Sequence, residues 1–255
     1  MNSIRSLAAL VLLALSATAQ EKKEAPKPVP KLLVFMPLGI VPGTTSTVTA
    51  RGLVLDQATE FKLEGAPGSS LKVKSKGKAA MPKDSEPAMV GDTQAELEIT
   101  IPGEATAEKV LLTAVTPAGT TDPHPLLLIP KEKFVAEKEP NGGFSQAQPV
   151  EPDQVVQGSI AQPRDVDVFR VKGKKGEVWT FEVVAARLGS FLDPILTVYS
   201  ESGHILATKD DDPGSRDATI KMALPADGVY FLSLVDAHDG GDAMHVYLLQ
   251  VRRAP

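Results

Sequence analysis

Short stretches of alternating apolar and polar residues recur along the chain, and no amphipathic helical pattern extends beyond about two turns. The AELEITI segment at residues 95–101, for example, places Leu97, Ile99 and Ile101 on one face of an extended strand. Proline and glycine turns separate such segments. This pattern predicts an all-β fold of two β-sandwich domains. The expected strands cover residues 32–35, 44–50, 59–63, 71–76, 95–101, 110–116 and 126–129, and then 166–171, 178–185, 195–199, 205–208, 219–224, 229–235 and 245–251.

The first nineteen residues have the layout of a cleavable secretory signal peptide. Arg5 supplies a positive charge, residues 7–15 are an unbroken apolar run, and the sequence ATA at 17–19 fits a cleavage site. The alternative is a membrane anchor, but a spanning helix needs about 20 apolar residues. We therefore expect a signal peptide at 1–19, a proline-rich tether at 20–30, a secreted or periplasmic protein, and no membrane span after cleavage.

The chain contains no cysteine, which excludes disulfides, thiol catalysis and thiolate-bound zinc. Its net charge is −5. Residues 21–136 hold equal numbers of acidic and basic side chains, so the excess lies in residues 137–255. An acidic surface argues against nucleic acid as a partner. It is compatible with divalent cations, with simple solubility as the alternative.

The C-terminal half resembles the bacterial pre-peptidase C-terminal domain family. The matching stretches, in the family's order, are EKEPN at 137–141, GSI at 158–160, DVDVF at 165–169, LDPIL at 192–196, DDD at 210–212 and LPADGVY at 224–230. The resemblance implies a jelly-roll-like sandwich over residues 131–255. It also implies a non-catalytic module of exported proteins, some members of which bind calcium and a protein substrate.

The N-terminal half resembles Ig-like domains of the IPT/TIG type. The resemblance rests on PG at 42–43, the strand ending in ARG at 50–52, and VTPAG at 115–119. It implies an Ig-like sandwich over residues 31–130. The pairing of the two domains resembles exported proteins of planctomycete-type bacteria.

A calcium site is the first candidate for chemistry. Glu137, Glu139 and Asn141 are spaced two residues apart, so an extended segment turns all three to one side. Calcium needs six to eight oxygen ligands, so a second segment must contribute. Asp165 and Asp167 alternate in the same way at the start of an expected strand, and Ser159 lies on the preceding one. The resemblance implies that these stretches provide further ligands, as their equivalents do in the calcium-binding members. Where the family commonly has an aspartate after the asparagine, this chain has Gly142. The alternative is that these side chains only cap turns. The predicted metal ligands are Glu137, Glu139, Asn141, Ser159, Asp165 and Asp167.

Two other acidic stretches are interpreted as solvated turns, with a cation as the alternative. They are residues 210–212 with Asp217, and the loop containing Asp236, Asp239 and Asp242. No catalytic motif such as G-x-S-x-G or H-E-x-x-H occurs. His124 and His238 are expected in loops, His204 in a hairpin turn and His245 in a strand.

Trp179 alternates with Phe181 and Val183, which favours a core position over a ligand platform. Residues 229–235 are apolar on both faces, which predicts a central strand that is covered on both faces. We therefore predict a non-enzymatic exported binding or accessory protein, with calcium at the domain junction. Its expected partner is an extracellular protein or polysaccharide. The alternatives are an accessory subunit or remnant of a secreted protease, an unrecognised hydrolase, and a structural protein of the envelope.

Overall fold

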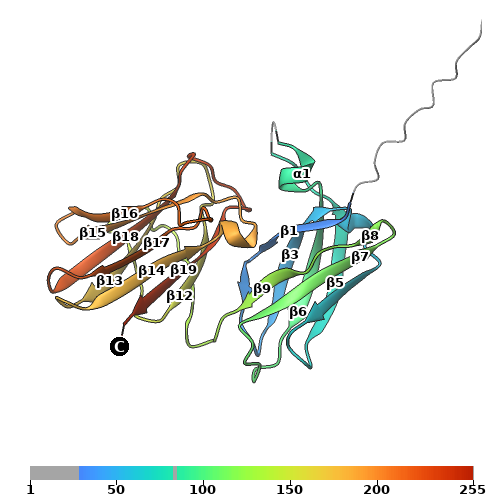
Figure 1. Cartoon of the computed structure of the whole chain (residues 1–255), viewed down its shortest axis with the longest axis horizontal. Helices are drawn as coiled ribbons and strands as arrows, with labels where there is room; N and C mark the ends of the chain where they lie inside the picture. The colour runs from blue at the N-terminus through green and yellow to red at the C-terminus, as the bar shows by residue number, and fades with distance from the viewer. Residues whose placement is uncertain (1–28, 83–84, 255) are drawn as a thin grey trace, which may run out of the picture.

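The structure is a computed structural model that describes residues 29–82 and 85–254. The expected signal peptide, residues 1–19, and residues 20–28 of the expected tether lie outside the described residues. The regular secondary structure of the described part is almost entirely β-strand, with one α-helical turn, α1 (Pro87–Val90), and two 3₁₀ turns, η1 (Leu55–Gln57) and η2 (Ala186–Leu188). The prediction of an all-β fold with two sandwiches is confirmed (Figure 1). No helix in this part is long and apolar enough to cross a membrane.

The first sandwich packs a four-stranded sheet against a five-stranded one (Figure 1). Its core follows the predicted alternation, because Leu97, Ile99 and Ile101 are all fully buried. The strand order of one sheet is β1 (Lys31–Met36), β3 (Thr45–Leu53), β6 (Thr93–Thr100) and β5 (Ser70–Lys78). That of the other is β2 (Gly39–Ile40), β9 (His124–Leu128), β7 (Lys109–Thr116) and β4 (Glu60–Glu64), with β8 (Gly119–Thr120) also paired to β7.

The second sandwich is built from two five-stranded sheets whose inner faces enclose a larger apolar core. Trp179 and Phe181 stack there and are fully buried, so the prediction of a core tryptophan is confirmed. One sheet has the order β10 (Phe134–Ala136), β12 (Val155–Ser159), β19 (Val246–Arg253), β14 (Val178–Val184) and β17 (Thr219–Ala223). The other has the order β11 (Gln148–Pro149), β13 (Asp167–Gly173), β18 (Gly228–Asp236), β15 (Pro194–Ser200) and β16 (Ile205–Lys209).

Strand β18 is the middle strand of its sheet, as its apolar composition predicted. Tyr230, Leu232 and Leu234 point into the core, whereas Phe231 on the other face is half-buried. The ring of Phe144 stacks on Phe231 with a centroid separation of 4.4 Å. The outer face of β18 is therefore covered by one loop aromatic and not by a second layer.

An apolar contact joins the two sandwiches. Side chains from β1 and β9 of the first meet side chains from η2 and β19 of the second in one buried cluster. The Nε2 atom of His124 lies 3.1 Å from the carbonyl oxygen of Leu188, and the amide of Gly39 donates to the Gln157 side chain at 3.1 Å. Gly189 lies so close to Leu33 that any Cβ there would clash with its carbonyl oxygen. The domains are thus packed against each other across a defined contact. The cluster consists of Val34, Leu38, Ile129, Val184, Leu188, Val246 and Leu248.

Candidate metal centre

Backbone hydrogen bonds hold Glu137, the residue after β10, beside strand β12 of the second sandwich. Strand β10 pairs in parallel with β12, and the amide of Glu137 extends this pairing by donating to Gln157 at 3.0 Å. On the other side of β12, Gly158 stands opposite Tyr247 of β19. A Cβ at Gly158 would lie 2.5 Å from the Glu137 carboxylate and 2.6 Å from the Tyr247 hydroxyl. Glycine at this position therefore makes room for both polar groups.

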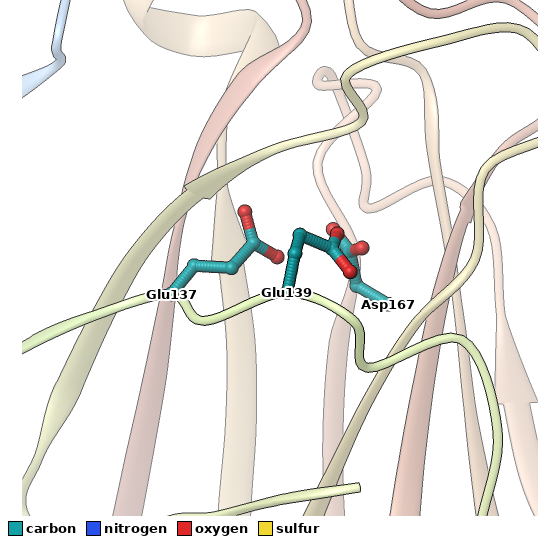
Figure 2. Close-up of side chains that lie close together, drawn as sticks. All are labelled: Glu137, Glu139 and Asp167. Atoms are coloured by element: carbon teal, nitrogen blue, oxygen red, sulfur yellow. The ribbon is translucent and has the colours of Figure 1, made fainter. Parts of the chain in front are cut away.

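Three acidic side chains converge beside this strand. One carboxylate oxygen each from Glu137, Glu139 and Asp167 lie within 4.8 Å of one another. Figure 2 shows the three carboxylates turned toward one another, two from the segment after β10 and one from the first residue of β13. Two regions separated by about thirty residues in sequence thus supply one cluster of oxygen atoms.

Hydrogen bonds hold the cluster in shape. Glu137 accepts from the Ser159 amide at 2.9 Å and from the Asn141 side-chain amide at 3.1 Å. Glu139 accepts from the Asn141 backbone amide at 2.8 Å. Asn141 and Asp167 are fully buried, yet the Oδ1 atom of each has no hydrogen-bond partner among the described residues. A buried acceptor without a partner is costly, so these two atoms are suited to an electropositive ligand.

Tyr247 is a member of the cluster that the sequence did not reveal. Its hydroxyl oxygen lies 2.5 Å from Glu137 Oε1 and 2.7 Å from Asp167 Oδ2. A phenol has one hydrogen to donate, so the two contacts together need a second proton on one of the carboxylates. Burial, followed by the neighbouring Glu137, raises the pKa of Asp167 to about 9, which places that proton on Asp167.

No lysine, arginine or histidine forms a salt bridge with Glu137, Glu139 or Asp167 within residues 29–82 and 85–254. Three carboxylates and an amide oxygen form an all-oxygen donor set, which suits hard divalent cations. The residues present fit calcium because two of their buried oxygens lack a hydrogen-bond partner in the part of the chain that the structure describes.

The structure gives two of the predicted ligands different contacts. Ser159 contributes its backbone amide to Glu137, and no hydrogen bond of its hydroxyl is seen in the described part of the chain. Asp165 accepts from the amides of Ala161 and Val166, at 2.9 and 3.2 Å, so its carboxylate caps a turn. It still lies close enough to contribute to the raised pKa of Asp167.

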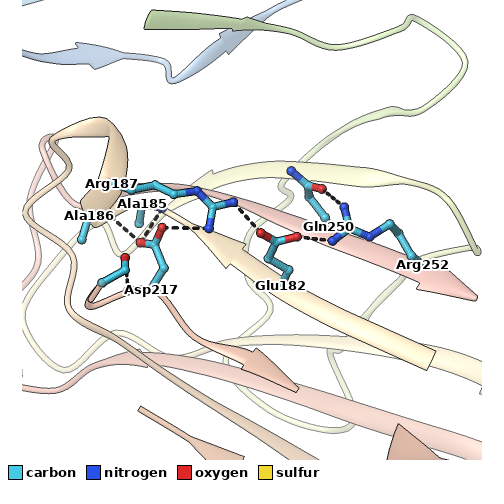
Figure 3. A network of polar contacts seen from close by, with 8 residues as sticks. Glu182, Ala185, Ala186, Arg187, Asp217, Gln250 and Arg252 are labelled. Carbon is cyan, nitrogen blue, oxygen red and sulfur yellow. Dashed lines mark hydrogen bonds and ion pairs between the residues drawn. The ribbon is translucent and has the colours of Figure 1, made fainter. Parts of the chain in front are cut away.

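Asp217 contacts the acidic run at residues 210–212 through its backbone carbonyl, which accepts from the Asp212 amide at 2.8 Å, while its carboxylate has other partners. Asp217 is fully buried and accepts from the amides of Ala185 and Ala186 at 3.0 and 2.6 Å, as Figure 3 shows. Its second oxygen lies 3.3 Å from the Arg187 guanidinium. In the other acidic loop, Asp236 accepts from the amides of Asp193, His238 and Gly240. The interpretation of both aspartates as solvated turn residues is therefore wrong, because each is buried and satisfies backbone amides.

Two histidine placements also differ from expectation. His124 begins strand β9, where it pairs with Leu112, and His245 precedes β19 by one residue. The Nδ1 atom of His245 lies 2.8 Å from Asp242, but no serine hydroxyl is hydrogen-bonded to His245 among the described residues. The Ser202 hydroxyl contacts His204 in an exposed hairpin turn, and no carboxylate of the described residues pairs with that histidine. These contacts do not assemble a nucleophile, base and acid in one place.

Comparison with known proteins finds partial similarity. No protein-family profile matches the chain. A stretch of 99 residues is 37% identical to a probable subtilase-type serine protease from Deinococcus radiodurans, covering 38% of this chain and 14% of the protease. The chain therefore spans only a small part of that relative's length.

Solved structures with some likeness to the fold include the pre-peptidase C-terminal domain of a collagenase from Bacillus anthracis, at 14% identity and a TM-score of 0.36, covering 46% of this chain and all of that one. Another is PliG, a periplasmic inhibitor of g-type lysozyme from Aeromonas hydrophila, at 17% identity and a TM-score of 0.33, covering 48% and 96%. A third is the Bacteroides ovatus protein SGBP-B with a mixed-linkage heptasaccharide, at 9% identity and a TM-score of 0.27, covering 89% and 74%. Likenesses of this size carry no functional argument.

Proposed function

We propose that this chain is an exported, non-catalytic binding or accessory protein whose second sandwich is a calcium-stabilised module of the pre-peptidase C-terminal type. One observation carries the metal part of the proposal. Asn141 Oδ1 and Asp167 Oδ1 are buried beside two further carboxylates and have no hydrogen-bond partner within residues 29–82 and 85–254. Calcium would supply the missing partner for both atoms, and Glu137, Glu139, Asn141 and Asp167 would hold it. The Ig-like, IPT/TIG-type character of residues 31–130 stays a prediction.

The cluster lies next to the contact between the sandwiches. Phe134 of β10 and Val155 of β12 pack against the shared apolar cluster, and Glu137 follows β10 directly. Gln157, which accepts from Glu137, also accepts from Gly39 of the first sandwich through its side chain. A cation that fixes Glu137 would therefore also restrain the segment that enters the second domain. This supports a role for calcium in fixing the angle between the domains.

Thermal unfolding with millimolar calcium and with chelator tests the metal site. A cation that binds only the folded state at about one hundred times its dissociation constant stabilises that state by about 2.7 kcal/mol. We expect Glu137→Gln and Asp167→Asn to reduce the calcium-dependent rise in melting temperature by the share that this site contributes. Glu151→Gln, which neutralises an exposed carboxylate elsewhere, is the matched control. Equal melting of the wild-type chain in calcium and chelator would refute the site.

Gly142→Asp provides a gain-of-function test. The resemblance implies a carboxylate at this position, and a Cβ there meets nothing closer than the Val166 carbonyl oxygen at 3.5 Å. The added side chain is therefore sterically tolerated, and we expect tighter calcium binding. Terbium provides an independent readout, because Tyr247 contacts two of the proposed ligands and would sensitise terbium emission. Tyr247→Phe should lose most of that emission while the ion still binds.

A second candidate function is an accessory part of a secreted protease. The identity of 37% over 99 residues with a subtilase-type protease favours it. Expression with a candidate protease from the same organism, followed by purification of one through a tag on the other, tests this function. A stable complex or a change in the protease's rate would support it. The proposed partner class is otherwise an extracellular protein or polysaccharide. Cleavage of chromogenic peptide, ester or glycoside substrates by the purified chain would overturn the non-catalytic assignment.

A further inference from the structure

A second group of acidic side chains lies at one end of the β15–β16 pair. These strands are antiparallel, with Leu196 opposite Lys209. Asp193 directly precedes β15, while Asp210 and Asp211 directly follow β16. Both segments therefore leave the sheet at the same end. One carboxylate oxygen from each of the three aspartates lies within 4.8 Å of the others.

Asp193 differs from an ordinary surface acid in its surroundings. The residue is only 9% exposed, and its Oδ1 atom is buried with no hydrogen-bond partner in the described part of the chain. Its main chain is fixed from both sides, since its amide donates to Asp236 at 3.0 Å and its carbonyl oxygen accepts from Ala237 at 2.7 Å. The main chain of Asp193 is thus held in place, and its carboxylate lies within 4.8 Å of those of the two exposed aspartates that follow β16.

The positive groups nearby only partly balance this cluster. Arg216 and His238 approach Asp193 Oδ2 at 3.6 and 3.7 Å, and their side chains are 54% and 78% exposed. Contacts of this kind between exposed groups contribute little. Lys209 pairs with Asp212, and among the described residues neither Asp210 nor Asp211 takes part in a salt bridge. Three carboxylates against one arginine leave the group formally negative.

We propose that Asp193, Asp210 and Asp211 form a second site for a hard divalent cation, of the class of calcium, separate from the cluster at Glu137. The buried Asp193 carboxylate provides the fixed ligand, and the exposed aspartates complete the site from the loop after β16. Oxygen is the only donor type offered by the three residues, which suits calcium or magnesium. Asp193 also lines a cavity of about 460 Å³ between the two sandwiches, so the cation would fix part of the cavity wall.

Counting bound calcium by isothermal titration of the whole chain tests the proposal. We expect two ions in the wild-type chain, one in Asp167→Asn and one in the double variant Asp210→Asn/Asp211→Asn. The control Glu104→Gln/Glu108→Gln removes the same charge from exposed positions of the first sandwich and should retain two. Because Asp210 and Asp211 are exposed, the double variant should fold, and circular dichroism verifies this. Asp193→Asn tests the buried ligand separately.

Arg216→Gln distinguishes a cation site from a structural ion pair. Arg216 competes with the cation for Asp193, so its removal should tighten the second binding event by roughly twofold to fivefold. If only one ion binds and Asp167→Asn abolishes it, the second site is refuted. It is also refuted if two ions bind with the same affinities before and after the double substitution. If the wild-type chain binds a single ion that survives Asp167→Asn but is lost in the double variant, the second site is supported and the proposed calcium site at Glu137 is contradicted.

Discussion

Asp167 and Asp217 are both fully buried in the second sandwich, but the groups that contact their carboxylates differ. Asp217 accepts two backbone amides and lies 3.3 Å from the Arg187 guanidinium, within the network of Figure 3. Asp167 faces other carboxylates and one phenol. One oxygen of each aspartate lacks a hydrogen-bond partner in the described residues, but that of Asp217 lies beside the Arg187 guanidinium, whereas no salt bridge to Asp167 is found there. Burial raises the pKa of both. A buried carboxylate that the chain itself compensates is structural, whereas one left uncompensated is suited to a cation or a proton.

The largest expected effect is the loss of the compensated carboxylate. Asp217→Ala leaves the amides of Ala185 and Ala186 without an acceptor, at a cost of about 1–3 kcal/mol for each unsatisfied group. We expect the free energy of unfolding in urea to fall by about 2–4 kcal/mol. The loss should be the same in calcium and in chelator, because Asp217 is not part of either proposed site. A loss seen only in calcium would contradict the distinction between the two aspartates.

Asp167→Asn, unlike Asp217→Ala, should lower stability only when calcium is present. In chelator the substitution removes a group that is costly to ionise, so stability should be unchanged or slightly higher. With calcium at about one hundred times its dissociation constant, the variant should lack about 2.7 kcal/mol of stabilisation that the wild-type chain gains. Urea unfolding of both proteins in both conditions measures this. A large loss in chelator would mean that Asp167 is structural in the same sense as Asp217.

If Asp167 binds calcium as proposed, its raised pKa makes that binding depend on pH. The folded chain holds a proton that the unfolded chain releases near its ordinary pKa, so this proton stabilises the fold most in acid. In chelator its contribution is lost as pH rises toward about 9. Calcium must displace the same proton, so its affinity should rise by about tenfold per pH unit below that value. Titrations at pH 6, 7 and 8 measure the slope, and it should be absent for calcium that still binds to Asp167→Asn.

The two aspartates also differ in how far the sequence reveals them. Asp167 alternates with Asp165 at the start of a strand, and together with Glu137, Glu139 and Asn141 it was predicted from spacing and resemblance. Asp217 sits in a polar stretch that predicts a solvated loop. Its burial depends on the end of β14, more than thirty residues earlier, and no local pattern encodes that contact.

The contacts of Tyr247 likewise could not be predicted from local sequence. Strand β19 is apolar on both faces, and nothing in its sequence indicates that one hydroxyl reaches Glu137, 110 positions away. The alternation of longer strands such as β6 and β14 was sufficient to predict them and their buried faces. Strands β2, β8 and β11 are only two residues long, which is too short to show an alternation of apolar and polar residues. They could therefore not be predicted from the sequence. The fold class follows from local pattern, while the buried polar contacts follow from long-range pairing.

The smallest expected effect on stability is that of Arg187→Gln, which removes the ion pair with Asp217 and leaves its two backbone hydrogen bonds in place. Arg187 is 40% exposed, and it contacts Glu182 as well as Asp217. Solvent screens such a pair, so Arg187→Gln should lower the free energy of unfolding by about 0.5–1 kcal/mol, well below the loss for Asp217→Ala. The guanidinium favours the ionised form of Asp217, so its removal raises the pKa of that carboxyl further. The loss should therefore shrink as pH falls and Asp217 takes up a proton in both proteins. Urea unfolding over a pH series in low and high salt measures it. A loss as large as that of Asp217→Ala would mean that the ion pair, and not the two backbone amides, is what compensates this buried charge.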